Sequence, residues 1–565
     1  MCVSSLAARE YGCSGNLFRL ACISIVILLS RTVLIRMPLQ RRSFFIIPLL
    51  ILMCALLGGI YGPRVQVASA ASSDDDVKTS MQSFTKVYSS VEQNFADPLS
   101  ADKAIYKGAI PGMLRTLDPH SNFFDPKDFE GLREDQRGHY YGVGMQVQGR
   151  NGKTIVIAPF VGSPAYKAGL RPGDIIIEVN DKVTEGLDST KVAELLKGPK
   201  GTAVQIKVSR EGMEKPVIFD IIRDEISRKS VPQIFALKPG IGYIRIEQFN
   251  ETTGREFEDG MKALDEDHLK GLVLDLRSNP GGLLTESVAV VDHLIPKGEV
   301  IVSHKGRSSA ERVYQARTGN RGRSYPIVVL VNRNSASAAE IVSGALQDHD
   351  RAWILGDNTF GKGLVQTVYP LIENAGLTLT TAKYYTPSGR LIQRDYSNVS
   401  FFDYYYRNNT ATRNSADVKM TDGGRTVYGG GGISPDEKFT PAKLTPFEIG
   451  LLSKFAFSEY TRHFFAVHKE KLPLGWTLDT KNIDLFHEWL LEKKIEFTEA
   501  DFTKDYDKVR RRLQAEIYKT AFSVDEAAKY EVMTDPEVEA AVSALPKAQA
   551  LISSARKIAD ERMKK

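Results

Sequence analysis

The N-terminal part of the chain has apolar residues at every third or fourth position. Between residues 77 and 137 this spacing, seen in Phe84, Val87 and Val91, predicts helices that each present one apolar face. The segment Asp118-Pro119-His120-Ser121 interrupts the pattern, because proline and short polar residues favour turns. The sequence therefore predicts a helical region that contains a turn at 118–121.

The pattern changes between residues 140 and 222. Short β-branched runs separated by glycine replace the helical spacing, and only the segment 190–196 remains helical. A region of about 85 residues is large enough to fold as a domain of its own. We predict a small mixed α/β domain with strands at 154–157, 175–179 and 204–208.

Strands alternate with helices between residues 241 and 439. The runs 272–276 and 327–331 are almost wholly apolar, as expected of strands that are buried on both faces, and helical patterns follow at 285–294 and 336–347. In α/β sheets of this kind, functional residues gather beyond the carboxyl ends of the strands.

After Pro441 the sequence is helical and rich in charge to its end, for example at 501–518 and 535–563. Its helices could dimerise, dock a regulatory partner or enclose the preceding region, and the sequence does not discriminate between these roles.

The composition is that of a globular protein of several domains, with 565 residues, 42% of them hydrophobic and 25% charged. The net charge of +5 arises at one end. Residues 1–70 contain seven arginines and one acid, so this segment carries +6 and the rest of the chain about −1, the difference between the two totals. The basic excess therefore gives no reason to expect a nucleic acid partner.

The first 70 residues resemble a targeting segment. Apolar stretches lie at 20–35 and 44–61, the second follows Arg41-Arg42, and Ala68-Ser69-Ala70 precedes a polar run. A basic start, an apolar centre and a small-x-small site are typical of a secretory signal, which predicts cleavage after Ala70 and export to the periplasm.

Two further readings concern the same segment. Met37 would start a signal of ordinary length, so residues 1–36 could be a mis-assigned extension, and about 18 apolar residues could also serve as an uncleaved anchor in the inner membrane. All four cysteines lie within residues 1–54, which leaves the exported part without a thiol nucleophile or a disulfide framework.

A hydroxyl nucleophile is suggested where the strand 327–331 runs into the next helix. The segment 332–340 contains Ser335 and Ser337 at this junction, close to backbone N–H groups at the positive end of the helix, which would favour a developing oxyanion. Such a serine can equally be a simple helix cap.

A lysine between two glycines strengthens the catalytic reading. Lys362 stands in Gly361-Lys362-Gly363 within a stretch of small and apolar residues, and no carboxylate flanks it in the sequence. A lysine can deprotonate a serine only when burial lowers its pKa by about 3 units from about 10.4. A phosphate-binding loop is the alternative, but Gly363 stands where that motif needs Ser or Thr.

A third segment, Arg277-Ser278-Asn279-Pro280-Gly281-Gly282, directly follows the buried strand 272–276. A glycine pair in this place can offer an N–H group to an oxyanion, and it can also be a plain tight turn.

Together these segments resemble the carboxyl-terminal processing peptidases of family S41, tail-specific Ser/Lys proteases related to the interphotoreceptor-retinoid-binding protein and the tricorn core. The resemblance runs from Met113 to Asp436, because several uncommon motifs occur in the order and spacing of the family. In the family the nucleophile lies 25 residues before the lysine, which implies Ser337 rather than Ser335, and a glutamine lies four residues after the lysine, which implies Gln366.

The resemblance also assigns the oxyanion hole and the substrate-binding domain. It implies that Gly281, Gly282 and Ala338 donate to the oxyanion, and Ala339 replaces a serine that is usual in the family. It identifies residues 138–225 as a PDZ domain, in which Gly162 to Asp174 form its most recognisable stretch. The loop that would bind the carboxylate of a substrate tail consists of Tyr141, Gly142, Val143, Gly144 and Met145.

The expected fold class is multidomain α/β, with a crotonase-like protease core, an inserted PDZ domain and helical ends. The domains would be a targeting segment at 1–70, a helical region at 71–137, the PDZ domain at 138–225, the core at 226–440 and a helical region at 441–565.

The expected function is that of an exported serine endopeptidase that captures the C-terminal tails of proteins. We expect no metal and no organic cofactor, and we take the nine scattered histidines, His120 included, as structural. A homo-oligomer or an adaptor could use the C-terminal helices. Two other classes remain: a PDZ scaffold with an inactive core, and an acyl-CoA enzyme of the crotonase superfold.

Overall fold

The computed structural model describes residues 75–100, 102–397, 399–406, 414–468 and 470–563. The chain divides into two compact units, residues 1–104 and 105–565. In the first unit residues 75–94 form a helix, as the spacing predicts, and Val77 and Phe84 on its apolar face are exposed. No helix within the described residues has the length and apolar character to cross a membrane, and the apolar stretches at 20–35 and 44–61 lie outside these residues.

The predicted turn at 118–121 separates helices from a strand that the sequence pattern did not reveal. Before the turn come η2 (Asp102–Ala109) and α3 (Ile110–Arg115), and after it come β1 (Asn122–Phe124) and α4 (Pro126–Arg137). Asp125 caps α4 by accepting the N–H groups of Lys127 and Asp128, and Gly138 ends the helix with a φ of 74°. β1 pairs with a strand more than 250 residues further along the chain, which places the turn beside the core.

Two paired strands connect the small α/β domain to the rest of the chain: β2 (His139–Gly142) pairs antiparallel with β9 (Asp224–Ser227). Between these strands an antiparallel sheet in the order β3-β4-β5-β7-β8, with β6 beside β5, packs on two helices. The predicted strands and helix lie within β4, β5, β7 and α6. The elements are β3 (Met145–Arg150), β4 (Lys153–Pro159), α5 (Pro164–Ala168), β5 (Ile175–Val179), β6 (Lys182–Val183), α6 (Ser189–Leu196), β7 (Ala203–Ser209) and β8 (Val217–Ile222).

The core contains a six-stranded sheet that is parallel except at β10. Its order is β10 (Gln233–Lys238), β11 (Ile241–Arg245), β12 (Gly271–Asp275), β15 (Ile327–Val331), β16 (Ala352–Gly356) and β21 (Glu437–Lys438). The helices α7 (Thr253–Ala263), α8 (Leu284–Leu294) and α9 (Ala338–Asp348) cover one face of this sheet.

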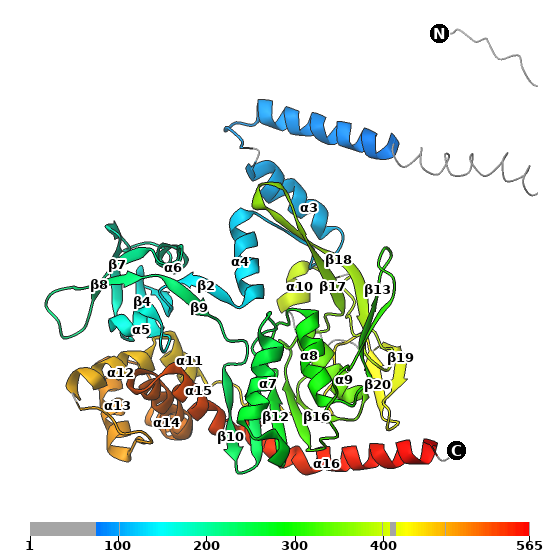
Figure 1. The fold of residues 1–565 in the computed structure, drawn as a ribbon. Coiled ribbons are helices and arrows are strands. Elements are labelled where there is room, and N and C mark those ends of the chain that lie inside the picture. The colour runs from blue at the N-terminus through cyan, green and yellow to red at the C-terminus, as the bar shows by residue number, and fades with distance from the viewer. Residues whose placement is uncertain (1–74, 101, 398, 407–413, 469, 564–565) are drawn as a thin grey trace, which may run out of the picture. The chain divides into compact units, whose positions relative to one another are not determined.

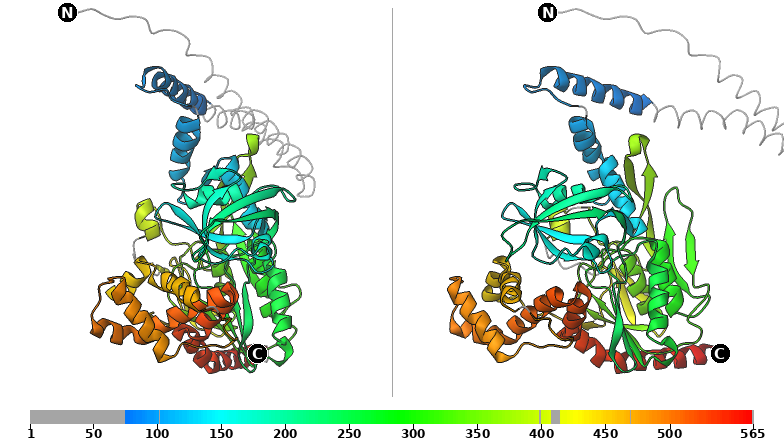
Figure 2. Two further views of the ribbon diagram at one scale, coloured as in Figure 1. Left: turned by 90° about the vertical axis from the view of Figure 1, so that its left-hand side faces the viewer. Right: turned by 60° about the vertical axis from the view of Figure 1, so that its left-hand side comes forward.

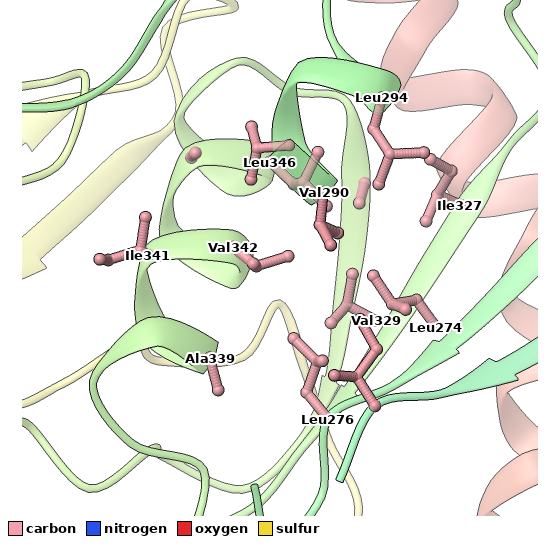
Figure 3. Packing of buried hydrophobic residues seen from close by; sticks show 14 of the residues in the cluster. Leu274, Leu276, Val290, Leu294, Ile327, Val329, Ala339, Ile341, Val342 and Leu346 are labelled. Atoms are coloured by element: carbon pink, nitrogen blue, oxygen red, sulfur yellow. The ribbon is translucent and has the colours of Figure 1, made fainter. Parts of the chain in front are cut away.

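Figure 3 shows how the helix side chains pack on this face, with Val290 and Val342 directed toward Val329 and Leu274 of the sheet. β12 and β15 are buried at every position. The prediction that these two strands are covered on both faces is therefore confirmed.

The other face of the same sheet is covered by the end of the chain. α15 (Val524–Met533) and α16 (Pro536–Met563) pack on it through small and aliphatic side chains, among them Val538, Ala541 and Ala548. Figure 1 shows α16 in red, running crosswise to the core strands. Of the roles left open for the C-terminal region, enclosing the core is thus the one that its last two helices perform.

The remaining C-terminal helices form a cluster of their own, in orange in Figure 2, with a core rich in aromatic residues. They are α11 (Pro446–Ser453), α12 (Ala456–Val467), α13 (Thr480–Glu492) and α14 (Glu499–Ala521).

A second, antiparallel sheet lies beside the first. β18 (Gly376–Tyr385) is its centre and pairs with β1, β13 (Val300–Lys305) and β17 (Leu364–Pro370), while β14 (Arg312–Gln315) extends β13. The short helix α10 (Phe401–Tyr406) and the hairpin of β19 (Asn414–Met420) and β20 (Thr426–Gly429) follow, and η3 (Glu266–His268) and η4 (Ile372–Asn374) are single turns.

Candidate active site

Ser337 lies where β15 has ended and α9 begins, in a backbone conformation that few residues other than glycine adopt. Its φ is 53° and its ψ is −112°. The conformation is held from both sides, because the Ser337 N–H donates to Glu340 Oε2 at 2.8 Å and the Ser337 carbonyl accepts the Tyr384 hydroxyl at 3.0 Å. Such strain is found most often at functional sites. The half-buried Ser337 side chain lines a cavity of about 390 Å³.

Ser335, the other serine of this junction, is used differently. Its hydroxyl donates to the Leu276 carbonyl at 2.8 Å and accepts the Asn332 N–H at 2.9 Å, and the residue is fully buried. These bonds tie the junction to the end of β12. The structure therefore separates the two serines on geometry, which their composition could not do.

The glycine turn after β12 lies directly against Ser337. A Cβ atom placed on Gly281 would be 2.7 Å from the Ser337 Cβ and 3.0 Å from the Ala338 nitrogen. The Gly281 N–H is already engaged, since it donates to Asn279 Oδ1 at 2.8 Å. Among the described residues, neither the Gly282 nor the Ala338 N–H has a hydrogen-bond partner, and both residues line the cavity. Within the part of the chain that the structure describes, two N–H groups without a partner thus belong to residues that line the cavity with Ser337.

Lys362 shares this cavity and is held by Gln366. The lysine Nζ donates to Gln366 Oε1 at 3.0 Å, and Gln366 Nε2 donates in turn to the His120 carbonyl. The pairing of β17 with β18 shifts register between Val365 and Gln366, and such irregularities re-aim side chains.

Burial lowers the pKa of Lys362 from its ordinary value, while the Glu340 and Asp118 carboxylates oppose that shift. No carboxylate flanks Lys362 in the sequence, but the fold brings in two acids that are distant along the chain. Desolvation is nevertheless the largest contribution, so the direction required of a base is kept.

Glu340 joins the serine segment to the lysine segment. Its buried carboxylate accepts the N–H groups of Ser337, Gly361 and Lys362 at 2.7–2.8 Å, and the Thr359 hydroxyl at 2.5 Å. Burial raises the pKa of Glu340 to about 7, and these four donors act against the shift. The spacing of Ser337 and Glu340, three residues apart at a helix start, is the sequence signal for such an arrangement.

The turn at 118–121 contacts Gln366, the residue that holds Lys362. The Asp118 carboxylate accepts the N–H groups of His120 and Ser121, at 2.7 and 2.8 Å, and the buried turn presents the His120 carbonyl to Gln366. Its sequence predicted a turn, but only the pairing of β1 with β18 reveals that the turn belongs to the site.

The predicted tail-binding loop lies at the start of the small domain. Tyr141 and Gly142 end β2, Val143 and Gly144 form the connection, and Met145 begins β3. The carbonyl groups of the connection are engaged, since Val143 accepts the Ala165 N–H at 2.8 Å and Gly144 accepts the Ser163 hydroxyl at 2.7 Å. β3 is an edge strand of its sheet.

One group of possible metal ligands comes together that the sequence did not suggest. Glu299, His349 and Asp422 place their ligand atoms within 4.8 Å of one another. His349 Nδ1 lies 2.7 Å from Asp422 Oδ2, and its Nε2 lies 2.7 Å from the Val300 carbonyl. Burial acts to lower the pKa of His349, but these two bonds and the charges of Asp422 and Glu299 raise it above its ordinary value.

Two known families match parts of this chain. Peptidase family S41 matches residues 240–398, and the PDZ domain family matches residues 156–210. The carboxy-terminal-processing protease of Bartonella bacilliformis is 42% identical over 297 residues, which are 52% of this chain and 68% of that protein. The carboxy-terminal processing protease CtpA of Bacillus subtilis is 33% identical over 360 residues, which are 63% of this chain and 76% of that protein.

The protease CtpB of Bacillus subtilis is likewise 33% identical, over 58% of this chain and 68% of that protein. The chain therefore belongs to peptidase family S41. It is a serine-type carboxy-terminal processing protease with a PDZ domain, and it binds peptide substrates. This result replaces both the acyl-CoA enzyme and the inactive scaffold as descriptions of the chain.

Proposed function

We propose that the chain is an exported endopeptidase that captures the C-terminal tail of a protein substrate and cuts near it with Ser337 and Lys362. One observation carries the proposal. A single cavity is lined by a serine on a strained backbone, a lysine whose pKa is lowered by burial, and Gly282 and Ala338, whose N–H groups have no partner among the described residues. These are the nucleophile, base and oxyanion donors that acyl transfer requires.

The reaction begins when neutral Lys362 takes the proton of the Ser337 hydroxyl. The Ser337 Oγ then forms a bond to the carbonyl carbon of the substrate, and the N–H groups of Gly282 and Ala338 stabilise the negative oxygen. As the C–N bond breaks, the lysine ammonium gives its proton to the leaving amine. Water that loses a proton to Lys362 then hydrolyses the ester and restores Ser337. Gln366 orients Lys362 throughout by accepting a hydrogen bond from Nζ.

Binding of the tail is assigned to the PDZ domain. The free edge of β3 can accept an extended peptide as an additional strand, so that main-chain hydrogen bonds give affinity. α6 borders this edge, since a Cβ atom on Gly149 would lie 3.1 Å from the Ser189 Oγ. The connection from Tyr141 to Met145 precedes β3 directly and would receive the terminal carboxylate.

Export to the periplasm rests on the pattern of residues 1–70. If it is correct, fusion of this segment to alkaline phosphatase will give an enzyme that is active outside the cytoplasm. An inactive fusion would refute the assignment.

The catalytic pair is tested with Ser337→Ala and Lys362→Ala. Each variant should abolish cleavage of a test protein that carries an apolar C-terminal tail, while circular dichroism and the unfolding midpoint remain those of a folded chain. Lys383→Ala is the matched control, because Lys383 is an exposed lysine on β18 and should retain full activity. Cleavage by either of the first two variants would refute the proposed pair.

A further inference from the structure

The His120 side chain is held between two phenols of α10. Its Nε2 lies 3.0 Å from the Tyr404 hydroxyl and its Nδ1 lies 3.0 Å from the Tyr405 hydroxyl. His120 and Tyr404 are both buried, and the Phe360 ring packs against both. Phe360 stands two residues before Lys362, so this cluster adjoins the segment that carries the proposed base.

The neighbouring hydrogen bonds decide where the protons lie. The Tyr405 hydroxyl donates to the Pro119 carbonyl at 3.0 Å, so its oxygen accepts a hydrogen bond from His120 Nδ1–H. The Tyr404 oxygen accepts the Gln393 side-chain amide at 3.2 Å and is free to donate its own proton to Nε2. Every donor then meets an acceptor when His120 is the neutral Nδ1–H tautomer.

The charged groups around the imidazole act in different directions. Burial is the largest influence on the pKa of His120. Together with the positive charges of Lys362 and Arg394, and against the opposing charge of Asp118, it lowers this pKa to about 4. The two remaining titratable neighbours are the phenols of Tyr404 and Tyr405, whose own pKa values burial raises. His120 is therefore neutral at the pH at which a lysine base works.

The imidazole is linked to the base through its own main chain. The His120 carbonyl accepts Gln366 Nε2, and Gln366 Oε1 accepts Lys362 Nζ. A side-chain amide of this kind has its orientation set by the partners of its two ends. A shift of the His120 carbonyl would let Gln366 turn and release the lysine.

We propose that His120 is a positioning residue, which the hydroxyl groups of Tyr404 and Tyr405 lock in place so that its carbonyl aims Gln366 and thereby orients Lys362. The inference rests on the proposed function of Lys362 as the base. It assigns to α10 a part in catalysis without any contact with the substrate.

The test uses Tyr404→Phe and Tyr405→Phe in the full chain, because these changes remove one hydroxyl each and keep the ring packing. Each variant should lower kcat by about 10-fold with an unchanged KM, which is the effect of losing one hydrogen bond of about 1.4 kcal/mol. Tyr406→Phe is the matched control, since Tyr406 belongs to the same helix and is 71% exposed. It should leave kcat within about 2-fold of the wild-type value.

A double-mutant cycle separates positioning from mere stability. In the Gln366→Ala background, Tyr404→Phe should lower kcat by less than about 2-fold, because the link it acts through is already broken. An unchanged kcat in both phenylalanine variants, or a full 10-fold loss that persists without Gln366, would overturn the inference. If Ser337→Ala or Lys362→Ala still turns over substrate, the proposed function fails and this inference fails with it. If both residues prove essential but the losses of kcat from Tyr404→Phe and Gln366→Ala are additive, only this inference fails.

Discussion

Gly281 offers the sharpest test of the oxyanion turn, because the structure gives the displacement that a single methyl group would cause. In Gly281→Ala the new Cβ would lie 2.7 Å from the Ser337 Cβ and 2.8 Å from the Ala336 carbonyl oxygen. Carbon atoms are in favourable contact at about 3.5–4.0 Å, so the turn or Ser337 must move by about 0.8 Å. Misplacement of about 1 Å can cost about 100-fold in rate.

The same substitution also has a conformational cost, which needs a control. Gly281 has a φ of 99°, where an alanine is strained by about 1–3 kcal/mol. Gly389 has a φ of 82°, is exposed, and would present its Cβ to open space. Gly389→Ala therefore carries a comparable backbone strain without the collision, and it lies outside the proposed machinery.

The assay compares steady-state cleavage of a tailed substrate and urea unfolding for the two variants. We expect both to lose about 1–3 kcal/mol of stability. Gly281→Ala should in addition lose at least about 100-fold in kcat, whereas Gly389→Ala should remain within about 2-fold of the wild type. A Gly281→Ala enzyme with nearly normal kcat would refute the placement of the oxyanion donors beside Ser337.

Three further predictions follow from the contacts of the folded chain. Glu340→Gln removes a charge that raises the pKa of Lys362. The acidic limb of the pH profile of kcat/KM should therefore move to lower pH, and kcat should fall. A shift of this limb to higher pH would contradict the electrostatic effect assigned to Glu340. Arg277 is paired with Asp275, Asp535 and Glu537, so Arg277→Met should lower the free energy of unfolding by about 3–5 kcal/mol in a urea titration, and a loss below about 1 kcal/mol would contradict it. Gly144→Ala would place a Cβ 2.5 Å from the Ser163 Cβ and so disturb the loop that is expected to bind the tail. Calorimetry should then show at least about 10-fold weaker binding of a tail peptide, while cleavage of an untailed peptide stays unchanged. Equal affinity would show that this loop takes no part in tail binding.

The C-terminal helices show where reasoning from sequence stopped. Their spacing predicts helices correctly, but it does not distinguish α14, which packs among other helices, from α16, which covers the core sheet. Both present an apolar face, and what that face meets depends on the path of the chain in three dimensions. The acidic start of α16 is a clear example, because Glu537 reaches Arg277 in front of the glycine turn at 2.8 Å. Pairs so distant in sequence have no local signal.

The sequence by itself indicated many of the helices and strands, because those depend on local spacing. The resemblance to the family supplied the proposed dyad, because the family spacing of 25 residues before Lys362 selects Ser337. The strand–helix junction at Ser337 and the glycines around Lys362 are visible in a few consecutive residues. Only the tertiary structure decided how the site is supported. In the folded chain the Ser335 hydroxyl donates to the Leu276 carbonyl, and the Gly281 N–H donates to the Asn279 side chain. The turn at His120 lies beside Gln366 and accepts a hydrogen bond from it. These outcomes depend on which strands pair across the sheets, and that is fixed by packing over the whole core.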